Sequence, residues 1–418
     1  MPAGGALWSA VAVSIDQFFG FGPGVPFVAH EVFTDREEQI GRLHQGILRA
    51  VGRPWPVSEL MDFQRAADNL HTVTGEGGIG KSTLVRHVAS LAMAGELDGI
   101  PENRAAVVVD FSDPASASFE TILLRVRAGL GGLAKSWPAF DVALAVYWER
   151  KHPGESLTAY LNRGTSESRR VAEQVGGTVD QVLGGFGAVT AAYQVISRLG
   201  TTVAQKARLR RLRAELPALD PILEERDPDR MLGYMPVLLA ADLERVRAQK
   251  DTLALCVLDT VENLQDLPPE RDGLEDLVSR LVYLMPNVAF VAAGRRPPRW
   301  DDPVRAVGLT YGGEHRWPGL AGRDRLVLDG FERASALEYL TTRLTIDDRP
   351  AIEVPIRERM IEGSGGSPLY LDLSAALYGQ YLAQRETPPA EAFGLGFPEL
   401  VLRTMRDLSE QDRDLLRA

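Results

Sequence analysis

The chain has 418 residues, 45% hydrophobic and 25% charged, which is enough for about two or three globular domains. The net charge of −11 argues against a general affinity for nucleic acid, and no window holds the roughly 18 to 20 apolar residues of a membrane-spanning helix. Cys256 is the only cysteine, which excludes an intramolecular disulfide. Together with the lack of a secretory leader pattern at the N-terminus, this favours a cytoplasmic location.

Five short apolar runs, rich in β-branched residues, follow one another along the chain. Each is almost continuously apolar rather than alternating, as is typical of strands buried on both faces of a parallel sheet. Helical patterns such as 119–130 and 274–284 fill most of the intervals, so the alternation predicts a doubly wound α/β domain. The predicted strands are Leu70–Thr74, Ala105–Phe111, Leu253–Thr260, Val288–Gly294 and Arg325–Phe331.

The connection between the second and third predicted strands is far longer than an ordinary crossover. It must contain an insertion, which we place at about 133–235. Helical patterns at 139–150 and 231–250 enclose a Gly-rich apolar stretch, Val175–Gly187, and a basic run, Lys206–Arg213. The glycines would allow close helix packing, but the stretch is too polar to span a bilayer. We therefore expect a helical subdomain with a solvated basic face rather than membrane contact.

The chain after Phe331 has a wholly helical pattern. Helices are expected at Ala334–Leu344, Ile352–Glu362 and Tyr370–Leu382, which indicates a small helical domain. A new helical pattern starts near Pro398 and stops with apolar residues at its end. We expect this last segment to be the beginning of a further, truncated domain.

The most specific motif follows the first predicted strand and fits G-x-x-x-x-G-K-[ST], the P-loop pattern. Its glycines let successive backbone N–H groups point into one concavity that binds phosphate oxygens, and the following helix adds its positive dipole end. Lys81 is expected to reach the β- and γ-phosphates, and the Ser82 hydroxyl to bind Mg²⁺. The residues predicted to hold ATP or ADP are Gly75, Gly77, Gly78, Ile79, Gly80, Lys81, Ser82 and Thr83.

Two later strands deliver charged residues at their carboxyl ends. Asp259 ends a predicted buried strand. In P-loop proteins, a carboxylate at such a strand end faces the water shell of Mg²⁺, and we assign this role to Asp259. Glu262 lies three residues further and would orient or deprotonate the attacking water, unless it is an ordinary loop glutamate. Arg295 follows the next strand and would contact the γ-phosphate, unless it is a surface arginine before the turn at Pro297.

With these motifs in this order, the sequence resembles the STAND class of P-loop ATPases, close to NB-ARC proteins and bacterial STAND regulators. The resemblance covers about 32–370, apart from the insertion. Phe33-Thr-Asp-Arg36-Glu37 looks like the family's F-x-G-R-E motif, which borders the adenine, although Asp35 replaces the usual glycine. This resemblance assigns Phe33 and Arg36 to the nucleotide site.

Three further segments carry the resemblance. Asp259-Thr-Val-Glu262 looks like the D-T-x-E form of the Walker B motif, and Gly294-Arg295 matches the family's sensor arginine. Ser367-Pro368-Leu369 resembles the G-x-P motif, whose proline packs on the base. The end of the chain, from Thr404 onward, looks like the opening of the family's winged-helix domain.

The resemblance implies an ASCE- or AAA-like, five-stranded parallel P-loop NTPase domain and a signalling switch. ADP would hold the domains closed, and exchange for ATP would open the chain and permit it to form homo-oligomers. A separate protein partner would act as sensor or effector. Mg²⁺-dependent hydrolysis of ATP would be slow. A DNA-associated ATPase of the initiator or transcription-regulator kind and a non-hydrolysing, nucleotide-bound scaffold remain alternatives. The expected domains are an N-terminal segment at 1–30, the nucleotide-binding domain at 31–330, the small helical domain at 331–390 and the start of a winged helix at 391–418.

Overall fold

A computed structural model describes residues 36–163, 166–183, 203–265, 273–320, 322, 324–346, 349–350, 352–383 and 388–393. The described residues divide between two compact units. One unit contains the segment before Glu38, the segment Glu76–Gly80 and the chain from Leu328 onward, and the other contains Glu38–Gly75 and Lys81–Val327. The short segment Glu76–Gly80 is thus grouped with the C-terminal part of the chain, although its two flanks belong to the larger unit.

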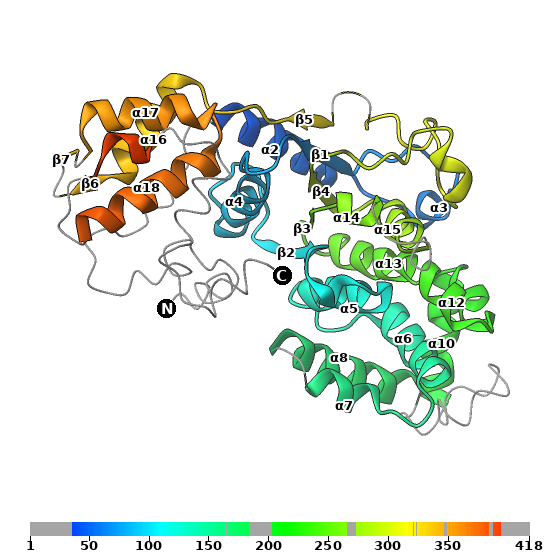
Figure 1. Ribbon diagram of the computed structural model, residues 1–418. Coiled ribbons are helices and arrows are strands. Elements are labelled where there is room, and N and C mark those ends of the chain that lie inside the picture. The colour runs from blue at the N-terminus through cyan, green and yellow to red at the C-terminus, as the bar shows by residue number, and fades with distance from the viewer. Residues whose placement is uncertain are drawn as a thin grey trace. The chain divides into compact units, whose positions relative to one another are not determined.

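A five-stranded parallel sheet forms the centre of the larger unit, in the order β2-β3-β4-β1-β5 (Figure 1). All residues of β1, β3 and β4 are buried, which explains why β3 and β4 are almost continuously apolar, whereas β1 also buries His71, Thr72 and Thr74. The strands are β1 (Leu70–Thr74), β2 (Asn103–Asp110), β3 (Thr252–Asp259), β4 (Ala289–Gly294) and β5 (Arg325–Val327).

Helices cover both faces of this sheet. On one face, side chains such as Val107, Cys256 and Phe290 join the main hydrophobic core with α5, α13 and α15. On the other face, His71 of β1 lies directly against Gly46 of α2, where an added Cβ would approach the imidazole to 2.6 Å. Helix α4 contacts β1, β2, β3 and β4. The prediction of a doubly wound, five-stranded α/β domain is therefore confirmed.

The helices of the larger unit follow the predicted pattern with small shifts of their ends. They are α2 (Glu37–Gly52), α3 (Val57–Leu60), α4 (Lys81–Ala94), α5 (Phe119–Leu130), α6 (Pro138–Lys151), α7 (Leu157–Asn162), α8 (Ser166–Leu183), α10 (Val203–Glu215), α11 (Leu219–Glu224), α12 (Pro228–Tyr234), α13 (Pro236–Arg247), α14 (Glu262–Gln265) and α15 (Gly273–Leu284). Short 3-10 helices lie at η1 (Pro114–Ser116) and η4 (Arg305–Gly308).

The insertion between β2 and β3 is helical, and two expectations within it need correction. The single helix predicted at 231–250 is two helices, because Pro236 begins α13 and has no N–H to continue α12. The expected close helix packing is not seen at Gly176 or Gly177, since no heavy atom among the described residues lies within 4 Å of an added Cβ. In the basic run, Leu209 and Leu212 are buried while Lys206 and Arg210 are exposed, so α10 presents a solvated basic face.

The smaller unit contains the three helices expected after Phe331, and also a short strand pair that the sequence analysis missed. The antiparallel pair consists of two-residue strands, so its pattern is too short to read from sequence. Strand β5 ends at Val327 rather than Phe331, because the Phe331 N–H donates to the carbonyl of Gly366 instead of continuing the sheet. The elements are α16 (Arg333–Arg343), β6 (Thr345–Ile346), β7 (Arg349–Pro350), α17 (Val354–Ser364), α18 (Pro368–Ala383) and η5 (Ala390–Ala392).

Several predictions concern residues outside the described ranges. They are Phe33 and its motif up to Asp35, the glycines at 184–187, and the segment from Pro398 to the end with its resemblance to a winged helix. Within the ranges that are described, no helix has both the length and the apolar character that crossing a membrane requires.

Candidate functional site: the carboxyl edge of the sheet

The Gly-rich loop joins the carboxyl end of β1 to the first residue of α4. Gly75, Gly78 and Gly80 have φ angles of 155°, 76° and 91°, values that residues with a Cβ rarely adopt. An added Cβ at Gly80 would meet nothing within 4 Å, so backbone conformation alone requires glycine there. Ile79 is buried and anchors the loop, while Gly77 is exposed. The turn that the motif predicts is therefore present.

Lys81 begins α4 and its ammonium group reaches back across this loop. Its Nζ donates to the carbonyl oxygen of Gly75 at 3.0 Å. Burial lowers the pKa of Lys81, while the nearby charges of Glu262 and Asp259 raise it and that of Arg295 lowers it. The structure thus brings Glu262, Asp259 and Arg295 within electrostatic range of the lysine, although they come from distant parts of the sequence.

Ser82 and Asp259 meet directly at the start of α4. The Ser82 Oγ donates to the Asp259 Oδ1 at 2.8 Å, and Asp259 is only 2% exposed. Burial raises the pKa of Asp259 above its usual range, against the lowering effects of Ser82 and Arg86. Because the hydroxyl proton points to the carboxylate, the two lone pairs of Ser82 Oγ face other directions and can accept a cation.

This arrangement fits Mg²⁺ held together with phosphates rather than by the protein alone. Mg²⁺ prefers oxygen ligands in an octahedron and usually takes only one or two carboxylates plus waters and phosphate oxygens. Among the described residues there is no group of three or more acidic, His or Cys side chains that would hold a metal ion. Ser82 would supply a direct oxygen and Asp259 would order a water in the metal's shell.

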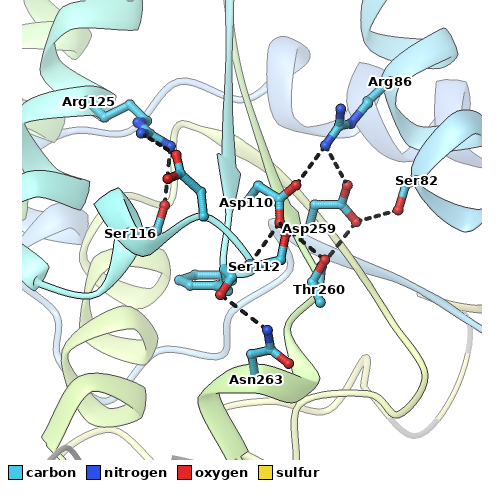
Figure 2. Close-up of polar contacts among 11 residues, drawn as sticks. Ser82, Arg86, Asp110, Ser112, Ser116, Arg125, Asp259, Thr260 and Asn263 are labelled. Atoms are coloured by element: carbon cyan, nitrogen blue, oxygen red, sulfur yellow. Dashed lines mark hydrogen bonds and ion pairs between the residues drawn. The ribbon is translucent and has the colours of Figure 1, made fainter. Parts of the chain in front are cut away.

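Beside Asp259 lie two further charged side chains, Arg86 and Asp110, which belong to none of the sequence motifs (Figure 2). Arg86 of α4 donates from Nη2 to Asp259 Oδ2 at 3.1 Å and to Asp110 Oδ2 at 2.9 Å. Burial raises the pKa of Asp110, but hydrogen bonds from Ser112 and the charge of Arg86 outweigh it, so the net shift is downward. The missed signal is the spacing of Ser82 and Arg86, since residues four apart share one face of a helix.

Thr260 follows Asp259 in an uncommon backbone conformation. Its φ of 59° makes it the non-glycine residue with positive φ in the described part of the chain. From this position its N–H donates to Asp259 Oδ1 at 3.0 Å, and its hydroxyl donates to Asp110 Oδ1 at 3.2 Å. The conformation therefore brings both donors of one residue onto two carboxylates.

Glu262 and Arg295 lie together at the end of β4. The backbone N–H of Arg295 donates to Glu262 Oε2 at 3.1 Å, and the Arg295 Nε lies 3.7 Å from Glu262 Oε1. An added Cβ at Gly294 would come within 2.6 Å of that same Oε2, so glycine at this position makes room for the carboxylate. The Glu262 side chain is nearly buried, while that of Arg295 is largely exposed.

Thr83 is exposed in the first turn of α4, whereas Arg36, Pro368 and the tip of the Gly-rich loop belong to the smaller unit. The N–H of Leu369 donates to the carbonyl of Gly78 at 3.2 Å, and an added Cβ at Gly78 would approach Leu369 to 2.9 Å. Pro368 is the first residue of α18, where its missing N–H costs nothing. Arg36 donates to the carbonyl of Asp329 at 2.8 Å and lies over the ring of Phe331.

These observations define a class of protein. A parallel sheet in this strand order, a Gly-rich loop from β1 into α4, and an acid at the end of β3, with β4 between β3 and β1, together make the P-loop NTPase fold. No protein-family model matches the chain, and no curated protein is detectably similar to it.

The comparison with solved structures gives matches of low similarity. The Orc1 protein of Aeropyrum pernix, determined in complex with DNA, aligns with a TM-score of 0.41 and 15% sequence identity. The alignment covers 90% of this chain and 66% of that chain, so this chain spans slightly less than two thirds of that protein. A likeness of this extent says nothing about the ligand or partners of the present chain.

Proposed function

We propose that the chain binds ATP or ADP with Mg²⁺ at Gly75–Thr83. The observation that supports this most is the hydrogen bond between Ser82 and Asp259, whose residues lie 177 positions apart in sequence. Ser82 directly follows Lys81, whose side chain bonds to the carbonyl at the start of a loop that has three glycines of positive φ. Phosphate oxygens would replace the Gly75 carbonyl as the partner of Lys81 and would accept hydrogen bonds from the N–H groups of the loop.

The adenine base would contact Arg36 and Pro368, which the family motifs assign to it. Both residues belong to the smaller unit. An arginine stacked on an aromatic ring and a proline offer flat surfaces that suit adenine. This assignment, like those of Glu262 as the base and Arg295 as the γ-phosphate contact, rests on the motifs together with their positions.

As the activity of this site we propose a STAND-type switch with slow hydrolysis of ATP to ADP and phosphate, in bacterial regulation or defence. The contact between Gly78 and Leu369 supports it, because a phosphate-binding loop joined to the first turn of α18 couples nucleotide to that helix. ATP would favour homo-oligomers, and a protein partner would supply the signal or the output.

The test is to purify the protein without added nucleotide, denature it, and identify what is released by chromatography. Near-stoichiometric ADP is the expected result, with ATP-dependent growth of the particle in light scattering. An empty site that turns over added ATP freely would contradict the switch, though not nucleotide binding. Failure to bind either nucleotide in the presence of Mg²⁺ would contradict the site itself.

A second candidate, a DNA-associated ATPase, is favoured by one observation. Helix α10 exposes Lys206, Arg210 and Arg211 on one stretch, although Arg211 is paired with Glu215. Duplex DNA bound through such a face would be released by salt and weakened by Lys206→Glu with Arg210→Glu. Absence of binding at low ionic strength would remove this candidate. A non-hydrolysing scaffold, the third, would show bound nucleotide without turnover.

A further inference from the structure

The two carboxylates behind the Gly-rich loop lie at directly paired positions of neighbouring strands. Asp110 ends β2 and Asp259 ends β3, and their Cα atoms are partners in the parallel register. Like charges at such positions repel each other, and Asp259 is buried, which increases the repulsion. An arrangement of this kind requires a compensating charge.

Arg86 supplies that charge from the helix that carries Ser82. Its Nη2 contacts one oxygen of each carboxylate, and its side chain is 31% exposed. Asp259 thereby has three donors: Ser82 Oγ and Thr260 N on Oδ1, and Arg86 on Oδ2. Three donors from three directions fix the orientation of the carboxylate plane, because each occupies a different lone-pair position.

We propose that Arg86 is the positioning residue of the cation site, holding Asp259 in place and offsetting the charge of Asp110 behind it. This inference rests on the proposed nucleotide and Mg²⁺ function. Without the guanidinium, Asp259 Oδ2 loses its partner and turns away from its charged neighbour, so the water that it orders for Mg²⁺ is lost. Outer partners of metal sites typically contribute about 10- to 100-fold in metal affinity.

A second arginine nearby offers a matched control. Arg125 of α5 donates to Asp113 Oδ2 at 2.9 Å and to Ser116 Oγ at 3.2 Å, and its side chain is 30% exposed (Figure 2). It therefore resembles Arg86 in exposure and in pairing with an aspartate at or just beyond the end of β2. It contacts neither Asp110 nor Asp259 through any of these bonds, so Arg125→Met tests for a merely structural effect.

The experiment measures binding of a fluorescent ADP analogue to the full chain during a Mg²⁺ titration, and again in EDTA. Arg86→Met is expected to raise the Mg²⁺ midpoint roughly 10-fold or more. Its affinity for the analogue in EDTA should stay within about two-fold, since that binding does not use the cation. Arg86→Lys should restore part of the loss, and Arg125→Met should match the unaltered protein.

The double variant Arg86→Met with Asp110→Asn separates charge balance from packing. If Arg86 offsets Asp110, removing both charges should lower the Mg²⁺ midpoint most of the way back to that of the unaltered protein. The effects of the two substitutions would then be strongly non-additive. Additive losses, or a midpoint unchanged in Arg86→Met, would overturn the inference while leaving nucleotide binding in place. If the unaltered protein binds no nucleotide with or without Mg²⁺, the proposed function fails, and this result is distinguishable from the others.

Discussion

Two arginine–carboxylate clusters in the larger unit have similar composition and different surroundings. The edge cluster consists of Arg86, Asp110 and Asp259 at the carboxyl ends of the strands, and two of its three side chains are partly exposed. The core cluster joins Arg127 of α5 to Asp141 of α6, and both side chains are 0% exposed. Sequence alone does not distinguish these two environments.

The core cluster is hydrogen-bonded to side chains of α8, although Nη1 of Arg127 has no partner among the described residues. Gln174 and Thr178 of α8 bond to Arg127 and Asp141, respectively, and Gln174 also donates to the carbonyl of Gly131. Burial raises the pKa of Asp141, and the charge and hydrogen bonds of Arg127 act against it. The comparison teaches that a charged cluster whose partners are all protein groups fixes helices, whereas one that opens to solvent at strand ends is available to a ligand.

The largest expected effect concerns the core cluster. Arg127→Met leaves Asp141 buried without its cation, which typically costs about 3–5 kcal/mol in the free energy of unfolding. Denaturant titration measures the loss, and nucleotide affinity under native conditions should stay within about two-fold. A variant of normal stability that binds nucleotide poorly would break the distinction between the clusters.

Lys81→Ala should weaken nucleotide binding by roughly 100- to 1,000-fold, because it removes charge-assisted hydrogen bonds to two phosphates. The protein should remain folded, but it loses the stabilisation that bound ligand adds, about 2.7 kcal/mol at a ligand concentration of 100 Kd. Calorimetric titration checks the affinity, with Lys135→Ala, an exposed lysine before α6, as the control. Unchanged nucleotide occupancy would contradict the assignment of the site.

Glu262→Gln should reduce ATP turnover by about 100-fold while nucleotide affinity changes little, because it keeps the side-chain shape and removes the base. Single-turnover release of phosphate measures the effect. Arg295 can still donate its N–H to the amide oxygen of the variant, so the end of β4 stays in place. Equal turnover in both proteins would favour the scaffold, or place the base elsewhere.

A pH-dependent effect on stability tests the comparison at a second buried carboxylate. Asp242 of α13 accepts from the N–H groups of Ala139 and Phe140 at the start of α6, and burial raises its pKa to about 7. The folded state therefore binds this proton more tightly than the unfolded state, so stability falls as pH rises from about 4 to 7, by up to about 1.4 kcal/mol per pH unit.

Asp242→Asn removes this titration and keeps an acceptor for the helix end. Free energies of unfolding should be measured at several pH values. The value for the variant should rise relative to that of the unaltered protein as pH increases from about 4 to 7. Parallel pH profiles would mean that Asp242 is already ionised throughout, held by Arg245.

Local patterns in the sequence predicted the framework of the fold. The buried strands β3 and β4 are almost continuously apolar, so their positions and the parallel class follow from their sequences. The ends of β5 and of the helix at 231–250 were wrong, because a contact of Phe331 with Gly366 and the proline at Pro236 decided them.

The edge cluster was predicted only in part, for a physical reason. Ser82 and Asp259 belong to motifs whose spacing is fixed by phosphate and Mg²⁺ chemistry. Arg86 and Asp110 belong to none, and the position of Asp110 beside Asp259 depends on the register of β2 with β3 across the insertion. The positive φ of Thr260 likewise could not be predicted from the sequence, because a β-branched residue rarely adopts it. The assignments of Phe33, Arg36 and Pro368 stay predictions.

The backbone of Thr260 has a consequence for any attempt to engineer this protein. A β-branched residue at φ 59° carries a conformational cost of order 1–3 kcal/mol, which asparagine or glycine would largely avoid. Thr260→Asn should therefore melt at a higher temperature, yet it gives up the hydroxyl that reaches Asp110. Stability and the bonding of the two carboxylates are thus in conflict at one position, and a search for thermostable variants would select against the hydrogen bond from Thr260 to Asp110.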